Sequence, residues 1–218
     1  MQPDNWSTVQ SGNNRFKNMK TLLSLSIAVL LLAGCKTTPV KFAQKAGIKT
    51  VHVEPKVDAD QPMRYGVDLH AGLFFALGNL IVNKQNQGGL ARMSGVMQSN
   101  NIVLPQMICA HVAEHLKQYP ELQMTDENSD GVFVIKILQY GFDAPGQSPK
   151  KAPFAVLQIQ LLDRNGKNIW MKQSDPDQLA PKTVGATWDE YEKDPKKLEA
   201  DWDARIDQTV SLLLPAAK

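Results

Sequence analysis

The chain has 218 residues, a formal net charge of +2, and 43% hydrophobic, 21% charged and 7% aromatic residues. This composition is that of a globular protein and excludes collagenous, low-complexity and intrinsically disordered chains. Positions 1–34 hold three basic residues and one acid, so positions 35–218 carry 21 basic and 21 acidic residues. A body without net charge argues against a protein that neutralises a phosphate backbone, and we expect no nucleic-acid partner.

The N-terminus has the layout of a secretory signal. A basic residue, Lys20, precedes an apolar run that ends in small residues up to Gly34. The apolar run is too short to span a bilayer comfortably, because a span needs about 20 residues. We predict a lipoprotein signal peptide at 19–34, preceded by a polar upstream start-site extension at 1–18.

The signal ends in Leu32-Ala33-Gly34-Cys35, which resembles the lipobox of bacterial lipoproteins. The resemblance implies that Cys35 carries a thioether-linked diacylglycerol, that the chain is cut before it, and that the new amine is acylated, for example with palmitate. More than one acyl chain gives stable anchoring to membrane lipid. The alternative is a buried helix that ends in a free cysteine.

The residue after the cysteine bears on location. In Gram-negative lipoproteins an Asp at this position usually signals retention in the inner membrane, and here the residue is Lys36. The resemblance therefore implies an outer-membrane lipoprotein with its body facing the periplasm. An orientation towards the cell surface stays open.

The mature chain begins with polar residues. We predict a tether at 35–46 and a single domain at 47–218, whose first strand is the alternating segment 48–53. After Cys35 only Cys109 remains, so the mature chain cannot form an intramolecular disulfide. Cys109 lies in an apolar helical pattern, and we expect it to be a small buried hydrophobe.

Residues 69–82 are unusually apolar and are predicted to form a helix. One interpretation is a buried core helix, and the other is an apolar helical arm over 69–98 that faces lipid or a partner. In the second interpretation Leu73, Phe74 and Phe75 are candidate partner-binding residues.

The remaining elements follow from periodicity and turn chemistry. Residues 102–118 form an amphipathic helix with apolar side chains every four residues, and 131–140 read as a central strand. The strand 154–162 and the following apolar segment flank Asn165-Gly166, the strongest hairpin signal in the chain. A last helix begins at Pro195, after the N-cap Asp194.

This order predicts an α+β fold, with helices packed on one face of a small, mainly antiparallel sheet in a two-layer sandwich. In element order the chain resembles periplasmic accessory lipoprotein domains of the TolB N-terminal type, which also occur in outer-membrane activators of peptidoglycan synthases. The resemblance is topological and carries over no motif residues.

One short motif suggests a catalytic hypothesis. His111, Glu114 and His115 match H-x-x-E-H, the inverted zinc-peptidase motif, in which two histidines one helical turn apart bind zinc and the glutamate acts as base. The domain is small for such an enzyme, no third ligand can be singled out, and the alternative is a solvated helix flank. Segment 126–131 is similar in composition to a calcium-binding loop, but it lacks the downstream glutamate that such a loop uses as a bidentate ligand. We therefore expect a polar turn.

No serine lies in a Gly-x-Ser-x-Gly context and no phosphate-binding glycine loop is present. We therefore predict no catalytic residues, no metal and no cofactor. Trp188, Tyr191 and Trp202 are candidates for an aromatic docking surface, and the alternative is that Trp202 packs in the core and the others cap it.

The leading hypothesis is a non-enzymatic lipoprotein, anchored in the outer membrane, that binds or assists another envelope protein. One alternative is an oligomeric assembly or transport component in which 69–98 inserts into a membrane or lines a ring. The other is the zinc peptidase.

Overall fold

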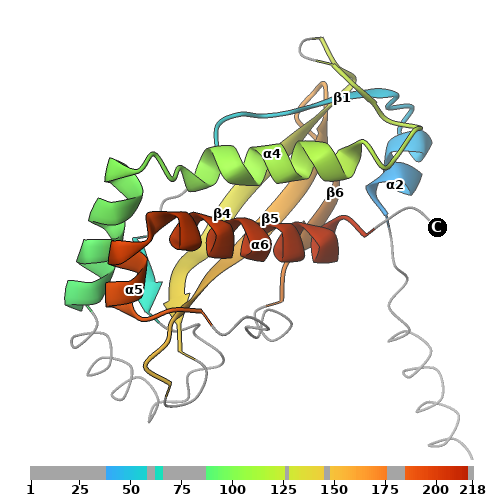
Figure 1. Cartoon of the computed structure of the whole chain (residues 1–218). Helices are drawn as coiled ribbons and strands as arrows, with labels where there is room; N and C mark the ends of the chain where they lie inside the picture. Colours follow the sequence, from blue (N-terminus) through green and yellow to red (C-terminus); the bar gives the residue numbers. More distant parts are fainter. Residues whose placement is uncertain are drawn as a thin grey trace, which may run out of the picture. The chain divides into compact units, whose positions relative to one another are not determined.

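The computed structural model describes residues 38–57, 62–65, 87–125, 128–144, 148–175 and 185–215. Within these ranges it confirms an α+β fold, with helices lying across a sheet (Figure 1). The elements, in chain order, are α2 (Pro39–Lys45), β1 (Thr50–Val53), β2 (Arg64–Tyr65), α4 (Leu104–Leu116), β3 (Gln123–Met124), β4 (Gly131–Asp143), β5 (Ala152–Asp163), β6 (Asn168–Gln173), α5 (Trp188–Lys193) and α6 (Pro195–Leu213). Residues 87–99 are also helical.

The sheet is mixed: its longest strands pair antiparallel, as predicted, and shorter strands add parallel pairs. Its strand order is β3-β1-β4-β5-β6, with β2 beside the far end of β4. Strands β4, β5 and β6 are antiparallel, whereas β1 runs parallel to both β3 and β4, and β2 runs parallel to β4. The long crossover through α4 permits the parallel pairing of β1 with β3. Strands β2 and β3 have two residues each, which is too short to show an alternation of apolar and polar residues in the sequence.

The hairpin predicted around Asn165-Gly166 is present between β5 and β6. The Asp163 carboxylate accepts hydrogen bonds from the backbone N–H groups of Asn165 and Lys167, both at 2.9 Å. Gly166 has φ +76°, a left-handed conformation that glycine adopts without strain. The turn is thus closed by its own side chain, and no ligand is needed to hold it.

Helices α4 and α6 cover one face of the sheet with the predicted apolar stripes (Figure 1). The buried positions are Leu104, Ile108, Val112 and Leu116 on α4, and Leu198, Trp202, Ile206, Val210 and Leu213 on α6. They meet Phe133, Ile135, Leu157 and Ile159 of the sheet in one hydrophobic cluster. Each such side chain contributes about 1.5–3 kcal/mol by leaving water. Within the described ranges no helix is long and apolar enough to cross a membrane.

Helix α2 occupies most of the predicted tether. Pro39 stands at its first position, where the missing N–H costs nothing, and Val40 and Ala43 are buried. Gly47, with φ +74°, ends the helix, because it lets the N–H of Ile48 bond to the carbonyl of Ala43 at 2.9 Å. Helix α2 is therefore part of the folded domain, and positions 36–38 separate Cys35 from its first residue.

The helical residues 87–99 pack into the same core as α4 and α6. Met93 and Met97 are buried, and the guanidinium of Arg92 pairs with Asp189 at 3.0 Å and Glu192 at 3.1 Å on α5. This part of the predicted arm 69–98 is thus an element of the domain. Residues 69–86 lie outside the described ranges.

Candidate functional site

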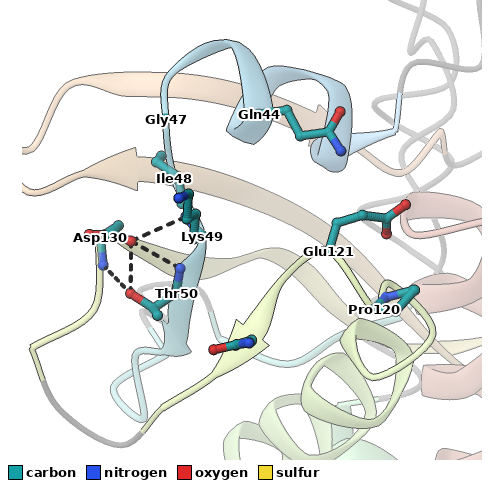
Figure 2. Close-up of a pocket in the computed structure, with 9 residues that line it drawn as sticks. Gln44, Gly47, Ile48, Lys49, Thr50, Pro120, Glu121 and Asp130 are labelled. Carbon is teal, nitrogen blue, oxygen red and sulfur yellow. Dashed lines mark hydrogen bonds between the residues drawn. The ribbon is translucent and has the colours of Figure 1, made fainter.

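A surface groove of about 520 Å³ lies where the end of α2, the start of β1 and the connection from α4 to β3 meet (Figure 2). The glycine turn after α2 and the Pro120 turn after α4 shape its two sides. Its lining residues are Gln44, Gly47, Ile48, Lys49, Thr50, Pro120, Glu121, Gln123 and Asp130.

One wall of the groove is fastened by Asp130. Its Oδ2 accepts hydrogen bonds from the backbone N–H groups of Lys49 and Thr50, both at 3.1 Å, and from the Thr50 hydroxyl at 3.0 Å (Figure 2). Its Oδ1 lies 2.9 Å from the guanidinium of Arg164. These bonds hold the pKa of the Asp130 carboxyl below its usual range, and the two bonds from the backbone N–H groups have the largest effect. Asp130 is therefore a fixed anion that joins β1 to β4, and it is unsuited to acid–base work.

Polar side chains around the groove are exposed to solvent. These are Gln44, Lys49 and Glu121; Lys49 adjoins Asp130, and Figure 2 shows Gln44 and Glu121 across the groove from it. The lining includes no histidine and no cysteine. An amide, an ammonium and a carboxylate around an open groove are suited to hydrogen bonds with a polar, extended chain.

Strand β3 borders the groove and forms the edge of the described sheet. The N–H groups of Gln123 and Thr125 bond to the carbonyls of Lys49 and Val51 at 2.9 Å. The N–H and C=O of Met124 between them therefore point away from the sheet. Gln123 and Met124 are both exposed, and the Met124 side chain is 37% accessible. An edge with outward backbone groups is the feature to which an incoming peptide strand adds.

The two histidines of the H-x-x-E-H motif have partners on the neighbouring helix. His111 Nε2 lies 2.8 Å from Asp203 Oδ1, and His115 Nε2 lies 2.9 Å from Asp207 Oδ1. Glu114 instead pairs with Lys117 on its own helix, and this bond lowers the pKa of the Glu114 carboxyl. The motif thus forms an interhelical contact between α4 and α6. Among the described residues no group of three or more ligating side chains is arranged to hold a metal ion.

Cys109 also lies on α4 and faces the segment that follows β1. Its thiol is partly buried and lies 3.6 Å from the carbonyl of Glu54. Burial, followed by the nearby Glu54 carboxylate, raises the pKa of the Cys109 thiol. A raised pKa disfavours the thiolate, so Cys109 is a packing residue and not an activated nucleophile.

The C-terminal aromatic residues surround Phe142. The ring of Phe142 makes edge-to-face contacts with Trp188 at 5.1 Å and Trp202 at 5.6 Å, and a tilted contact with Tyr191 at 5.9 Å. Tyr191 and Trp202 are fully buried. Burial and the 2.7 Å hydrogen bond to Asp201 raise the pKa of the Tyr191 hydroxyl. The structure therefore corrects the docking-surface prediction for these two residues, because they belong to the core.

Trp188 is partly exposed, but one side of its ring is covered. A Cβ added at Gly89 would meet the Trp188 ring at 2.5 Å, so the indole packs directly on the helical backbone there. The ring closes this end of the core.

The remaining predicted site residues lie outside the described ranges. These are the lipidation residue Cys35 and the partner-binding candidates Leu73, Phe74 and Phe75. Their assignments stay predictions.

No local sequence pattern singles out the residues of the groove. Asp130 looked like a turn former because its bonding partners, Lys49 and Thr50, are about 80 positions away. Met124 stands in a strand of two residues, and Gln44 stood in the expected tether. The available signal was local: the spacing of Val40 and Ala43 together with Gly47 is typical of a short capped helix.

The comparisons with known proteins find structures of low similarity. No family model and no curated protein matches the chain. A DUF330 protein from Xanthomonas campestris is 12% identical, with a TM-score of 0.43, over 77% of this chain and 81% of its own. The dodecamer PelC from Paraburkholderia phytofirmans is 9% identical, with a TM-score of 0.28, over 76% and 86%. A lipoprotein from Neisseria meningitidis is 16% identical, with a TM-score of 0.20, over 57% and 79%. At these TM-scores the matches assign the chain to no family.

Proposed function

We propose that the mature chain is a lipoprotein of the outer membrane, anchored through Cys35, whose periplasmic domain binds another envelope protein without catalysis. The observation that carries the anchor is the sequence Leu32-Ala33-Gly34-Cys35 at the end of a short apolar run. Its position fits the folded domain, since α2 begins at Pro39, four residues after the expected lipidated residue.

The groove beside β3 is the surface at which a protein partner fits best. It combines an open backbone edge at Met124 with the exposed polar groups of Gln44, Lys49 and Glu121. A segment of the partner adds to β3 as a further strand, and its side chains enter the groove. The non-catalytic role rests on the fixed charge of Asp130, the raised pKa of Cys109 and the interhelical pairing of His111 and His115.

Mass spectrometry of the protein purified from its native membrane tests the anchor. The expected product begins at Cys35 and carries a diacylglycerol thioether and an N-acyl chain. A bare sulfur with residues 1–34 still attached would refute it.

In-cell photocrosslinking tests the groove. A crosslinking amino acid at Gln44 and, separately, at Glu121 is expected to capture one and the same envelope protein. Met124→Pro is expected to abolish that capture, because proline removes the outward N–H of β3 and leaves the Gln123 and Thr125 bonds to β1 intact. The matched control, Met171→Pro on β6, leaves capture unchanged. Capture that survives Met124→Pro, or different proteins from the two positions, would overturn the groove assignment.

A further inference from the structure

The N-terminal segment of the mature chain is basic and lacks acidic residues. Positions 36–49 contain Lys36, Lys41, Lys45 and Lys49 and no acidic residue, whereas positions 50–218 carry 17 basic and 21 acidic residues. The mature chain is therefore neutral as a whole, with +4 in this segment and −4 in the rest of the sequence. The positive charge of the segment favours its approach to an anionic surface.

The α2 outer face, defined here as Lys41, Phe42 and Lys45, points away from the core. Val40 and Ala43 fill the inner side of the helix, which places Lys41 and Lys45 one turn apart on the opposite side with Phe42 beside them. The Phe42 side chain is 37% accessible. No acidic group in the described part of the chain forms an ion pair with Lys41 or Lys45. The carboxylates that line the adjacent groove are those of Glu121 and Asp130, and Asp130 is already paired with Arg164.

The chain length before α2 fixes how far this face can lie from an anchored residue. Cys35 and Pro39 are four residues apart, and a fully extended chain of that length reaches about 14 Å at most. A helix with its side chains is about 10–12 Å across, and electrostatic interactions decay over about 8 Å at physiological ionic strength. The start of α2 therefore stays within about 14 Å of the anchored residue, and a helix that lies along the surface brings its side chains within electrostatic range of the headgroups.

We propose that the α2 outer face docks on an anionic lipid surface, with Phe42 entering the interface and Lys41 and Lys45 meeting phosphate headgroups, so that the domain is held in one orientation. This inference rests on the proposed lipid anchor. Lysines that meet anionic headgroups around an inserted aromatic ring are the pattern of an interfacial helix, and the acyl chains supply the affinity that a helix of seven residues lacks.

The test uses the full protein as purified from its native membrane, mixed with phosphatidylethanolamine–phosphatidylglycerol vesicles whose acyl chains are brominated. Phe42→Trp introduces a fluorophore at an exposed position that the core does not depend on. Its emission, after subtraction of the parent protein's, is expected to shift to shorter wavelength and to be quenched by the bromine. The charge reversal Lys41→Glu with Lys45→Glu, or high salt, is expected to reduce the quenching.

Lys193→Trp is the matched control. It lies on α5, beside the N-terminal end of α6, whereas α2 lies towards the opposite end of that helix (Figure 1). This tryptophan is expected to show no quenching. A protein that floats with the vesicles but shows equal quenching at the two positions, or none at Phe42→Trp, overturns the docking and leaves the anchor standing. A protein that does not float overturns the anchor and the docking together.

Discussion

The two ends of the domain use their polar and aromatic groups in opposite ways. At the Phe142 end, the hydroxyl of Tyr191 and the guanidinium of Arg205 are buried and bond to Asp201 and the carbonyl of Pro153. At the groove end, Asp130 is held by hydrogen bonds, while the side chains of Gln44 and Glu121 are exposed to solvent. The comparison indicates that one end stabilises the fold and the other is free to bind. Substitutions at the two ends should therefore separate stability from partner capture.

The largest effect is expected at the Phe142 end. Trp202→Ala removes a fully buried indole and leaves a cavity, so the free energy of unfolding should fall by about 3–5 kcal/mol. Gln44→Ala in the groove should change it by less than about 0.5 kcal/mol, because that side chain is exposed. Denaturant titration of the two variants measures both values. Similar losses at the two positions would contradict the division between the ends.

A smaller effect is expected where Trp188 closes the core. Gly89→Ala forces a Cβ to within 2.5 Å of the indole ring, so the variant should lose about 1–3 kcal/mol as the ring moves. Gly95→Ala, in the same helical segment, is the matched control, since a Cβ there meets open space. It should gain about 0.5–1 kcal/mol from helix propensity. Thermal unfolding of both variants tests the packing, and equal behaviour would refute it.

The smallest effect is expected at Asp130, the tied residue of the groove end. Because folding lowers the pKa of this carboxyl, its contribution to stability is present above the ordinary carboxyl value and is lost as the pH falls through the lowered folded value. Asp130→Asn should therefore be less stable than the parent near neutral pH, and the difference should shrink in acid. Stability curves of both proteins from about pH 7 to pH 2 provide the measurement. A difference that stays constant across that range would show that the charge of Asp130 does not matter.

Local patterns were sufficient for the elements that carry the core. The four-residue spacing on α4 and α6 and the Asn165-Gly166 turn each depend on neighbours in the chain, and the structure confirms all three. The helix α2 and the two-residue strands β2 and β3 are too short to produce a clear period. The parallel pairing of β1 therefore stayed hidden.

The site depends on distant partners, which local patterns do not report. Asp130 meets Lys49 and Thr50 across about 80 positions, and His111 meets Asp203 across 92. The same residue types fit a calcium loop and a zinc motif when only their neighbours are considered. Aromatic residues near the C-terminus suggested binding, but a tryptophan on an amphipathic stripe is better explained by burial, as Trp202 shows.

The start of α2 at Pro39 restricts where the protein can work. If Cys35 is lipidated as proposed, the segment 36–38 is too short for the domain to cross the periplasm. The domain therefore stays in a thin layer next to the membrane that anchors it. A partner anchored in the cytoplasmic membrane would have to span the periplasm itself to reach the domain. A partner in the outer membrane would reach the domain by lateral diffusion, because both proteins would move in the plane of the same membrane.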